Sequence, residues 1–386
     1  MSNKPIRVLH FSSHDENCGV GKYQENYLVG MAKMPDVQNK FFDSSPYKTR
    51  IMSPEELDST IAQMEKELHD YDILHIQHEF GLFSNAEFRK MVEMAKRINK
   101  RVVVTVHTSP GFALKPVKLG GLGPRSFLRY ARDKRNYAIF WRNHIDTFLQ
   151  ADLLIAHNNA TVQSLETAGV PSARIKKLIH PVYEVPAPKP SHEITKALNK
   201  QKGDVIFCTT GFIHRYKGMF EAVKALKYLP ENYKLAVIGG MHPTSDEVTM
   251  YDKLTDLVNT LGLRDRVYIT GFVPDDDRLN ALIRECDVCI YPYDKVYYAN
   301  VSSGSLNLAF ANDISAIAYP TESFKEIAEI ADGALVLTDT FAYYELAREL
   351  QRIDLSKQRT LSKQYAKKMA WPKMAKALVE AYKDIV

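Results

Sequence analysis

Strand-like and helix-like segments alternate along the whole chain. A helical spacing of apolar residues covers 21–34, and the apolar strand-like runs of the first half lie at 6–11, 73–77, 102–107 and 153–157. In the second half, the apolar runs recur at 205–208, 234–238, 267–269, 288–291, 315–318 and 334–337. Apolar runs that alternate with helical patterns predict βαβ units, and therefore a parallel sheet in each half.

A proline-rich stretch, 185–190, is typical of an extended linker between the two halves. We therefore predict two doubly wound, Rossmann-like α/β domains, over residues 1–186 and 187–371, followed by a C-terminal helix at about 372–386. Sheets of this class bind ligands outside the carboxyl ends of their strands. The two domains are expected to face each other across a cleft, with one substrate on each side.

Composition narrows the class of protein. A chain of 386 residues accommodates two domains of ordinary size, and a charged fraction of 25% argues against wholesale disorder. No run of about 18 apolar residues is present, so no transmembrane helix is expected. The N-terminus leads straight into a strand-like run without an apolar signal core, which predicts a cytoplasmic protein.

The four cysteines are Cys18, Cys208, Cys286 and Cys289. The spacing of Cys286 and Cys289 would suit a metal, but no second Cys/His pair lies near them in the sequence. We therefore predict buried thiols at these positions and no metal site.

The most informative local pattern lies at residues 204–221. An apolar run ends at Gly211, a short loop carries Arg215 and Lys217, and Gly218 opens a helical pattern. A strand that leads two cations into a loop at a helix N-terminus favours an anion, because backbone N–H groups and the helix dipole reinforce the side-chain charges. The stretch therefore predicts a site for a phosphate or pyrophosphate group.

Residues 110–143 form a strongly basic segment, with eight Lys or Arg side chains against the single acid Asp133. Interleaved with these charges are five aromatic residues: Phe127, Tyr130, Tyr137, Phe140 and Trp141. One interpretation is a solvated basic helix over a core stripe, since positions 127, 130, 137, 141 and 145 share one helical face. The other is a platform for an anionic partner, either lipid headgroups or a nucleic-acid backbone with stacked bases. The segment does not choose between these partners.

A series of short motifs in a fixed order resembles the retaining glycosyltransferases of family four, which have the GT-B fold. The motifs lie at 18–23, 75–81, 104–108, 151–158, 179–182, 211–218, 270–273 and 369–372, so the resemblance covers nearly the whole chain. It implies that residues 1–186 form the acceptor side and that 187–371 bind the donor. It also implies that the C-terminal helix crosses back onto the first domain.

The resemblance assigns donor binding to glycines that let the backbone approach phosphates and to the basic loop, which clamps the diphosphate. Arg215 and Lys217 would act as catalytic cations, each lowering the barrier to diphosphate departure by about 3 kcal/mol. The other donor-binding residues that it implies are Gly19, Gly21, Gly211, His214, Phe272, Val273, Asn300, Ser302, Ser303, Gly304 and Ser305.

His107 ends the run 102–107, and its position together with the resemblance implies a catalytic contact with the transferring sugar or the β-phosphate. Glu79 is a candidate general base for an acceptor hydroxyl. The acceptor-side residues as a group are Lys22, His78, Glu79, Lys115, Lys118, Arg125, Arg129 and Arg132. No D-x-D motif occupies a suitable loop, so these predictions assign charge neutralisation at the diphosphate to the cations and not to a metal.

One stretch departs from the family pattern. The family usually carries two glutamates separated by seven residues, where this chain has Asn300 and Leu308. Residues 302–305 still form a helix start that can offer N–H and hydroxyl donors to a phosphate. Leu308 cannot accept a hydrogen bond from a ribose, so donor recognition at this point is expected to differ from that of the family.

The sequence thus predicts a metal-independent, retaining glycosyltransferase, moving a hexosyl or pentosyl group from a nucleotide-diphosphate sugar to an acceptor hydroxyl. The acceptor would be anionic, either a lipid-linked glycan at a membrane surface or a hydroxylated base in DNA, as in phage DNA modification. No cofactor is expected, and the protein would be cytoplasmic or peripheral at the inner membrane face. Two alternatives share the fold: a nucleotide-sugar epimerase and a catalytically inactive nucleotide-sugar-binding homologue.

Overall fold

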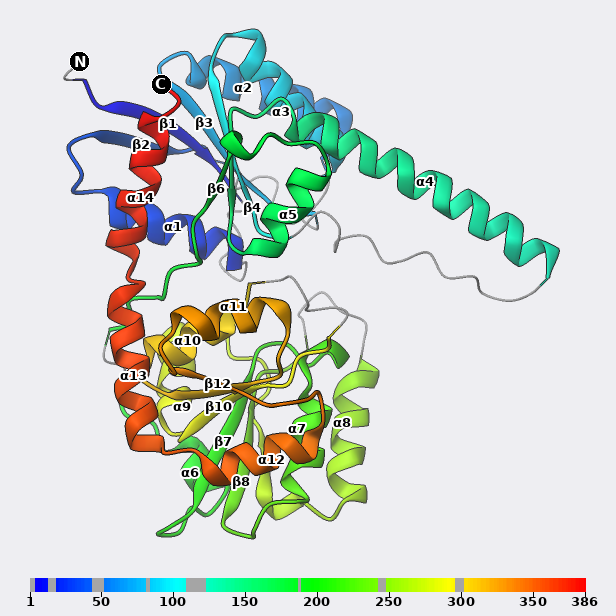
Figure 1. Cartoon of the computed structure of the whole chain (residues 1–386), viewed down its shortest axis with the longest axis vertical. Helices are drawn as coiled ribbons and strands as arrows, with labels where there is room; N and C mark the ends of the chain where they lie inside the picture. The colour runs from blue at the N-terminus through cyan, green and yellow to red at the C-terminus, as the bar shows by residue number, and fades with distance from the viewer. Residues whose placement is uncertain are drawn as a thin grey trace. The chain divides into compact units, whose positions relative to one another are not determined.

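The computed structural model describes residues 4–12, 19–43, 52–80, 84–108, 123–186, 189–241, 248–295 and 302–386. The chain divides into two compact units, each built on one sheet (Figure 1). Unit 1 comprises residues 1–179, 300–302 and 371–386, and unit 2 comprises residues 180–299 and 303–370.

Unit 1 contains a six-stranded sheet in the order β2-β1-β3-β4-β5-β6, with every neighbouring pair parallel. Its strands are β1 (Ile6–Phe11), β2 (Val37–Phe41), β3 (Ile73–His78), β4 (Arg101–Val106), β5 (Leu153–Ala156) and β6 (Ile175–Lys177). The strand order reverses between β1 and β3. Ligands of open α/β sheets bind at such a switch point.

The helices of unit 1 cover both faces of this sheet (Figure 1). They are α1 (Gly19–Met31), α2 (Pro54–Leu68), α3 (Asn85–Arg97), α4 (Pro124–Phe148), α5 (Asn159–Thr167) and α14 (Trp371–Lys383), with a 3-10 turn, η2, at Ser172–Arg174. The C-terminal helix α14 packs on α1, and the rings of Trp371 and Tyr27 meet edge to face with centroids 4.7 Å apart.

The two faces of this sheet differ in chemistry, as the period of two in β3 illustrates. Leu74 and Ile76 join an aliphatic core with residues of α2, α3, α4 and α5. His75 and Gln77 point to the other face, where the His75 ring contacts the Tyr382 hydroxyl of α14. The sheet therefore has one apolar face and one face that carries buried polar side chains.

His78, at the end of β3, lies on the apolar face. Its ring is fully buried between Phe88 and Phe148, with centroid distances of 4.5 Å and 5.0 Å. Neither of its ring nitrogens has a hydrogen-bond partner in the described part of the chain. Burial, together with the nearby His144, lowers the pKa of His78 to about 3.

Unit 2 also contains a six-stranded parallel sheet, in the order β12-β11-β10-β7-β8-β9. Its strands are β7 (Val205–Thr210), β8 (Tyr233–Ile238), β9 (Val267–Ile269), β10 (Val288–Tyr291), β11 (Ser315–Ala318) and β12 (Leu335–Leu337). This is the 3-2-1-4-5-6 order of dinucleotide-binding folds, and the order reverses between β7 and β10.

Helices and 3-10 turns connect the strands of unit 2. They are α6 (Glu193–Ala197), η3 (Arg215–Lys217), α7 (Met219–Leu226), α8 (Val248–Thr260), η4 (Arg264–Arg266), α9 (Asp276–Arg284), α10 (Gly304–Ala311), α11 (Glu322–Ile330), α12 (Tyr343–Arg352) and α13 (Leu355–Lys368). Cys208, Cys286 and Cys289 are buried here, which confirms the prediction for these thiols, and the Sγ atoms of Cys208 and Cys289 lie 3.2 Å apart. Cys18 lies outside the described residues.

The predicted fold class of two doubly wound α/β sheets is confirmed, and the boundaries of β1, β9, β10 and β11 agree with the prediction. The sequence interpretation missed β2 and β6. These two strands end the sheet of unit 1 on either side. Only Val37 of β2 and no residue of β6 is buried, so their sequences, VQNKF and IKK, lack an apolar run.

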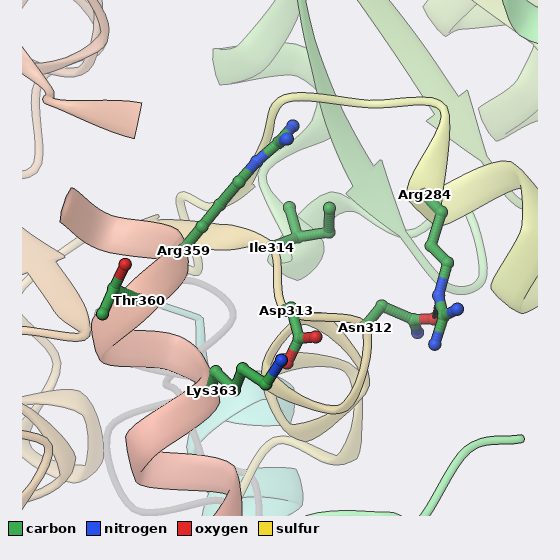
Figure 2. A pocket seen from close by; sticks show the side chains of 7 residues that line it. All are labelled: Arg284, Asn312, Asp313, Ile314, Arg359, Thr360 and Lys363. Atoms are coloured by element: carbon green, nitrogen blue, oxygen red, sulfur yellow. Dashed lines mark hydrogen bonds between the residues drawn. The ribbon is translucent and has the colours of Figure 1, made fainter. Parts of the chain in front are cut away.

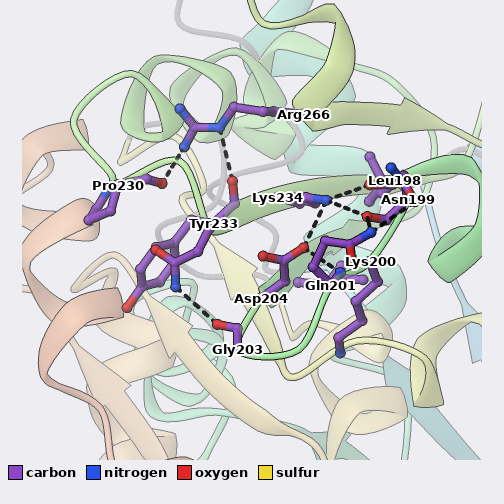
Figure 3. Close-up of polar contacts among 12 residues, drawn as sticks. Leu198, Asn199, Lys200, Gln201, Gly203, Asp204, Pro230, Tyr233, Lys234 and Arg266 are labelled. Carbon is purple, nitrogen blue, oxygen red and sulfur yellow. Dashed lines mark hydrogen bonds and ion pairs between the residues drawn. The ribbon is translucent and has the colours of Figure 1, made fainter.

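A buried lysine ties the sheet of unit 2 to the segment that precedes it (Figure 3). Lys234 of β8 is 9% exposed, and its Nζ donates to the carbonyl oxygens of Leu198 and Asn199 at 2.6 and 2.9 Å. The same ammonium pairs with Asp204 Oδ2 at 2.8 Å. Burial alone would raise the pKa of Asp204, but hydrogen bonds from the Gln201 amide and Lys234 hold it below its ordinary value.

Replacing Lys234 by methionine should destabilise unit 2 by about 3 kcal/mol or more, because the Asp204 charge and two carbonyl groups would lose their donor. Denaturant unfolding followed by circular dichroism measures the change. Lys325→Met is the control, since Lys325 and Glu322 form an exposed pair and its loss should cost at most about 0.5 kcal/mol. Equal unfolding midpoints for both variants would contradict the assignment.

Acidification should destabilise unit 1 through its buried histidines. Burial lowers the pKa of His10 and of His157 to about 4 and that of His78 to about 3, so all three are neutral when folded and charged when unfolded below pH 6.5. Their stabilising contribution is complete above pH 6.5 and is lost as the pH falls towards 4. The charging of each histidine should lower the free energy of unfolding by about 2 kcal/mol between pH 6.5 and 5.

Thermal unfolding from pH 7.5 to 4.5 tests this dependence. His78→Leu removes a neutral ring that has no hydrogen bond, so it should flatten the curve of melting temperature against pH. His69→Gln changes an exposed histidine and should leave the slope as in the wild type. A wild-type melting temperature that stays constant over this range would disprove the prediction.

Candidate functional site

The predicted anion-binding loop lies at the switch point of the sheet in unit 2. Gly211 follows the end of β7, and η3, at Arg215–Lys217, carries the two cations just before α7. The neighbouring strand β10 leads to α10, which begins at Gly304. The loops after β7 and β10 leave the sheet on opposite faces, so a ligand can enter between them.

Two glycines let the strand ends of this edge approach one another. Gly239, directly after β8, has φ 154°, and a Cβ there would lie 1.9 Å from the carbonyl oxygen of Gly211. Gly218 has φ 70°, and a Cβ there would lie 1.8 Å from the carbonyl oxygen of Pro292. Only glycine fits both positions, because any Cβ would collide with the facing carbonyl group. The two glycines therefore allow these backbone segments to come into contact.

Lys217 points towards the start of α10. Its Nζ donates to the Tyr293 hydroxyl at 3.1 Å and lies 4.7 Å from the centroid of that ring. The same hydroxyl lies 3.2 Å from Ser303 Oγ, which accepts a hydrogen bond from the Leu306 amide and so caps α10. The lysine and the helix N-terminus therefore belong to one connected polar cluster. Sequence reasoning missed Tyr293, whose aromatic strand-end position carries no distinctive signal.

Arg215 adds a second cation to this loop. Its side chain is exposed, and within the described residues its guanidinium has neither a hydrogen bond nor an ion pair. His214 has a structural contact, since its ring accepts from the Tyr216 amide at 3.5 Å and begins η3. The loop thus offers one restrained and one exposed positive charge to an anion.

A flat aromatic surface borders the same edge. Phe212 and Phe272 stack with ring centroids 5.7 Å apart and an interplanar angle of 13°. A Cβ at Gly240 would lie 2.3 Å from the Phe272 amide nitrogen, so the segment after β9 touches the glycines that follow β8. Val273 is 9% exposed, so its side chain has little surface to offer a ligand.

The remaining predicted donor residues surround the start of α10. Gly304 and Ser305 form its first turn, and a Cβ at Gly211 would lie 3.6 Å from Ser305 Oγ. Ser302 Oγ accepts a hydrogen bond from the Asn158 amide at 3.4 Å. Asn300, which replaces the first family glutamate, lies outside the described residues.

A separate cavity of about 440 Å³ opens near the opposite edge of this sheet, before β11 (Figure 2). Arg284 and Arg359 line it, but Arg284 Nε donates to Asn312 Oδ1 at 2.8 Å and Arg359 Nη2 to Asp287 Oδ1 at 3.3 Å. Arg284 thus joins the ends of α9 and α10, and Arg359 joins α13 to the residue before β10. The cavity is therefore not the predicted donor site.

In unit 1, His107 follows β4 and lies within a cluster of aromatic rings. The Tyr23 ring meets it edge to face with centroids 4.7 Å apart, and the His157 ring lies 5.2 Å away. Gln77 Oε1 lies 2.9 Å from His107 Nε2. Sequence reasoning singled out His107 but missed Gln77 and His157, although Gln77 belongs to the 75–81 motif.

The glycine loop of unit 1 is only partly described. Gly19 and Gly21 form the first turn of α1, and the space around a Cβ at Gly19 is open to 4 Å. Lys22 is half-buried in the same turn. The residues that join β1 to this helix, including Cys18, lie outside the described part.

The predicted acceptor-side residues do not form one group. His78 is enclosed in the apolar core, so its ring does not present itself to an acceptor. Glu79 is half-buried and accepts a 2.6 Å hydrogen bond from the Thr108 hydroxyl, one residue beyond His107. Lys115 and Lys118 lie outside the described residues.

Arg125, Arg129 and Arg132 lie on α4, whose N-terminal part projects from the sheet of unit 1 (Figure 1). The stripe interpretation is wrong for Phe127, which is 62% exposed, whereas Ile145 at the other end of the helix is buried. Core packing therefore begins only near the end of α4, because the earlier turns extend beyond the elements that could cover them. The side chains of Tyr137, Phe140 and Trp141 are not described.

Within the described ranges, no group of three or more His, Cys, Asp or Glu side chains is placed to hold a metal ion. No described helix combines the length and the apolar character needed to cross a membrane.

Two family models match successive parts of the chain. The model described as Glycosyltransferase Family 4 matches residues 39–181, and the model described as Glycosyl transferases group 1 matches residues 190–369. No protein with a curated description matches the sequence.

Solved structures match the chain over almost its full length. HepE of Anabaena, in complex with UDP, has a TM-score of 0.70 at 14% identity, covering 98% of this chain and 100% of its own. Sucrose-phosphate synthase of Thermosynechococcus elongatus has a TM-score of 0.68 at 16% identity, with 98% of each chain covered. WaaG, a glycosyltransferase involved in lipopolysaccharide biosynthesis, has a TM-score of 0.62 at 14% identity, covering 97% of this chain and 99% of its own. At such identities the likeness shows the shared GT-B fold, and the two family models add the class of enzyme: the chain is a glycosyltransferase, which the Family 4 model matches in its first part and the group 1 model in its second.

Proposed function

We propose that this chain is a retaining, metal-independent glycosyltransferase whose unit 2 binds a nucleotide-diphosphate sugar. The observation that supports it best is the polar cluster at the switch point of that sheet. There Lys217, Arg215 and the N-terminus of α10 offer positive charge and N–H donors beside a backbone that glycines keep bare. A diphosphate matches this arrangement in charge and in hydrogen-bonding capacity.

The reaction gives the two cations their role. Cleavage of the sugar–phosphate bond leaves a second negative charge on the departing β-phosphate, and fixed positive charge stabilises it as it develops. Arg215 and Lys217 would supply that charge without a metal ion. The stacked Phe272 and Phe212 rings offer a flat apolar surface on which a nucleotide base could rest. HepE, with a similar fold, has been solved with UDP and with UDP-glucose, which agrees with such a donor.

Unit 1 would supply the binding site for the acceptor and the side chain of His107. In this proposal His107 hydrogen-bonds the transferring sugar or the β-phosphate, and Glu79 helps to orient the acceptor hydroxyl. Retention follows if the acceptor attacks from the face that the diphosphate leaves, with the departing phosphate taking the hydroxyl proton.

The acceptor is proposed to be anionic and held at a membrane surface. Six cations lie between Arg125 and Arg142 of α4 against one acid, Asp133. Leu128 is 72% exposed and Ile139 is 49% exposed on the same stretch. Exposed apolar side chains among cations suit the boundary between headgroups and acyl chains, whereas a nucleic-acid backbone requires only the cations. A lipid-linked glycan fits this combination best.

The double variant Arg215→Ala/Lys217→Ala should bind UDP at least about 100-fold more weakly, because two charge-assisted hydrogen bonds to phosphate would be lost. Isothermal titration calorimetry without added metal measures the affinity. Lys227→Ala removes an exposed lysine just after α7 and is the control for charge. Unchanged UDP affinity in the double variant would refute the diphosphate clamp.

A donor assay without acceptor separates the proposed activity from its two rivals. Interconversion of the nucleotide sugar would identify an epimerase. Absence of both hydrolysis and transfer with every donor tested would indicate a binding protein without chemistry. Transfer that persists in EDTA and keeps the anomeric configuration of the donor would support the proposal.

Vesicles with anionic lipid should bind the protein more tightly than neutral vesicles, and the affinity should fall steeply with salt because phosphate contacts release counterions. Co-sedimentation at 50 and 200 mM salt measures this. In the variant Arg129→Gln/Arg132→Gln/Arg135→Gln binding should be at least about tenfold weaker, at roughly 1 kcal/mol per cation near the surface. Stronger competition by DNA than by vesicles at physiological salt would reassign the acceptor to nucleic acid.

A further inference from the structure

A continuous chain of polar side chains crosses the sheet of unit 1 and ends at His107. His107 Nε2 lies 2.9 Å from Gln77 Oε1, and Gln77 Nε2 donates to Gln24 Oε1 at 2.5 Å. Gln24 Nε2 lies 2.9 Å from His10 Nδ1, and His10 Nε2 lies 2.8 Å from Asn39 Oδ1. These residues belong to β3, β1 and β2, to helix α1 and to the residue that follows β4, so the chain links four neighbouring strands.

The middle of this chain is sealed from water. Gln77, Gln24 and His10 are each 0% exposed, whereas Asn39 and His107 at the two ends are half-buried. A buried donor or acceptor that lost its partner would cost about 1–3 kcal/mol. Each link must therefore pair a donor with an acceptor. A hydrogen bond that ran the other way at one link would force the next link to reverse as well.

The links run in a single direction. An amide oxygen can only accept, so the contact with Gln77 Oε1 requires a hydrogen on His107 Nε2. Gln24 Nε2 donates towards His10 Nδ1, so the hydrogen of His10 lies on Nε2 and is given to Asn39. From His107 to Asn39, every residue donates to the next one.

A branch of the chain opposes reversal at Gln77. Gln77 Nε2 also lies 3.3 Å from His75 Nε2, and His75 is held by the hydroxyls of Thr105 and Tyr382 at 2.8 and 2.6 Å. Turning the Gln77 amide over by itself would place its oxygen against the oxygen of Gln24, so a reversal would also have to turn the Gln24 amide over and change the tautomers of His10 and His75. Because Tyr382 belongs to α14, the C-terminal helix also supports this arrangement.

We propose that Gln77 is a positioning residue that fixes His107 as the tautomer with its hydrogen on Nε2, which makes Nδ1 of the neutral ring a hydrogen-bond acceptor. The consequence for catalysis rests on the proposed function: Nδ1 would accept from a hydroxyl of the sugar or of the acceptor, and of the two contacts proposed for His107 this tautomer excludes the one with the β-phosphate, whose oxygens only accept. The titratable side chains in ring contact with His107 in the described part are Tyr23 of α1 and His157 after β5. His157 Nδ1 donates to the Leu178 carbonyl oxygen at 2.8 Å, so that neutral ring has a fixed tautomer as well.

The wild-type protein tests the tautomer directly. Two-bond ¹H–¹⁵N spectra of ¹⁵N-histidine-labelled protein at pH 8 should show His107 and His10 with the hydrogen on Nε2 and His157 with it on Nδ1. Single His→Gln variants assign the signals. A neutral His107 with its hydrogen on Nδ1 would overturn the proposal, whatever the protein catalyses.

Gln77→Glu keeps the acceptor atom and adds a negative charge. The pH at which His107 titrates should then rise by about one unit or more, because the carboxylate favours the protonated ring. Gln38→Glu makes the same charge change on the exposed face of β2 and should leave the titration of His107 unchanged. An equal titration in wild type and Gln77→Glu would overturn the proposal.

Gln77→Leu removes the acceptor with little change in volume. If transfer is observed, kcat should fall by about tenfold or more with KM for the donor nearly constant, because the ring is bound in place but no longer held in one tautomer. Gln77→Glu should recover part of kcat and shift its pH profile. Should Gln77→Leu fail to fold, the wild-type spectra and the Gln77→Glu titration still decide the question.

The outcomes separate the two claims. If His107→Asn retains kcat, the proposed catalytic role of His107 is wrong, although the tautomer is still decided by the spectra. If His107 has its hydrogen on Nδ1 while His107→Asn is inactive, the role stands and the positioning by Gln77 is wrong.

Discussion

Parallel pairing of the strands is the constraint on which both candidate sites depend. Because the pairings within each described sheet are parallel, all carboxyl ends of its strands lie at one edge, and residues far apart in sequence meet there. In unit 2 this edge brings Gly211, Gly239 and Ser305 together. In unit 1 it brings His107 beside Gln77. The reversal of strand order then leaves space between the loops that follow the two central strands.

The two faces of the sheet in unit 1 have different roles: one carries the apolar core that stabilises the unit, and the other carries the polar side chains that lead to His107. The face towards α2, α3, α4 and α5 buries aliphatic and aromatic side chains, which is the main source of stabilisation in a domain of this size. The opposite face, under α1 and α14, buries Gln24, Gln77 and His10, whose neutral groups stabilise only if each link is made. That requirement gives the polar face a single arrangement, which is what an oriented His107 needs. His78 shows that histidines of one motif can lie on both faces, because neighbouring residues of a strand point in opposite directions.

Much of the fold was predictable from sequence because the central strands are buried on both sides and read as apolar runs. The outer strands β2 and β6 were not, because nearly all of their residues are exposed or only partly buried, and their polar side chains hide the pattern. The position of Arg215 and Lys217 in a loop at the switch point was predictable, since cations between a strand-ending glycine and a helix start carry a local signal. Tyr293 and Phe212 had no such signal, and their roles come from neighbours distant in the chain. The same holds for α4, where the helical period suggested a core face, but none of the other described elements of unit 1 reaches the first turns.

The sequence by itself determined the class of fold, the order of its elements, the glycine positions and the two cations of the loop after β7. These are local properties, set by hydrophobic period, by backbone freedom at glycine and by charge. Only the tertiary structure decided which of several histidines faces the site and which tautomer the polar chain imposes on it. The physical reason is that a buried hydrogen bond depends on the partner across the sheet, and strand register, not local sequence, selects that partner.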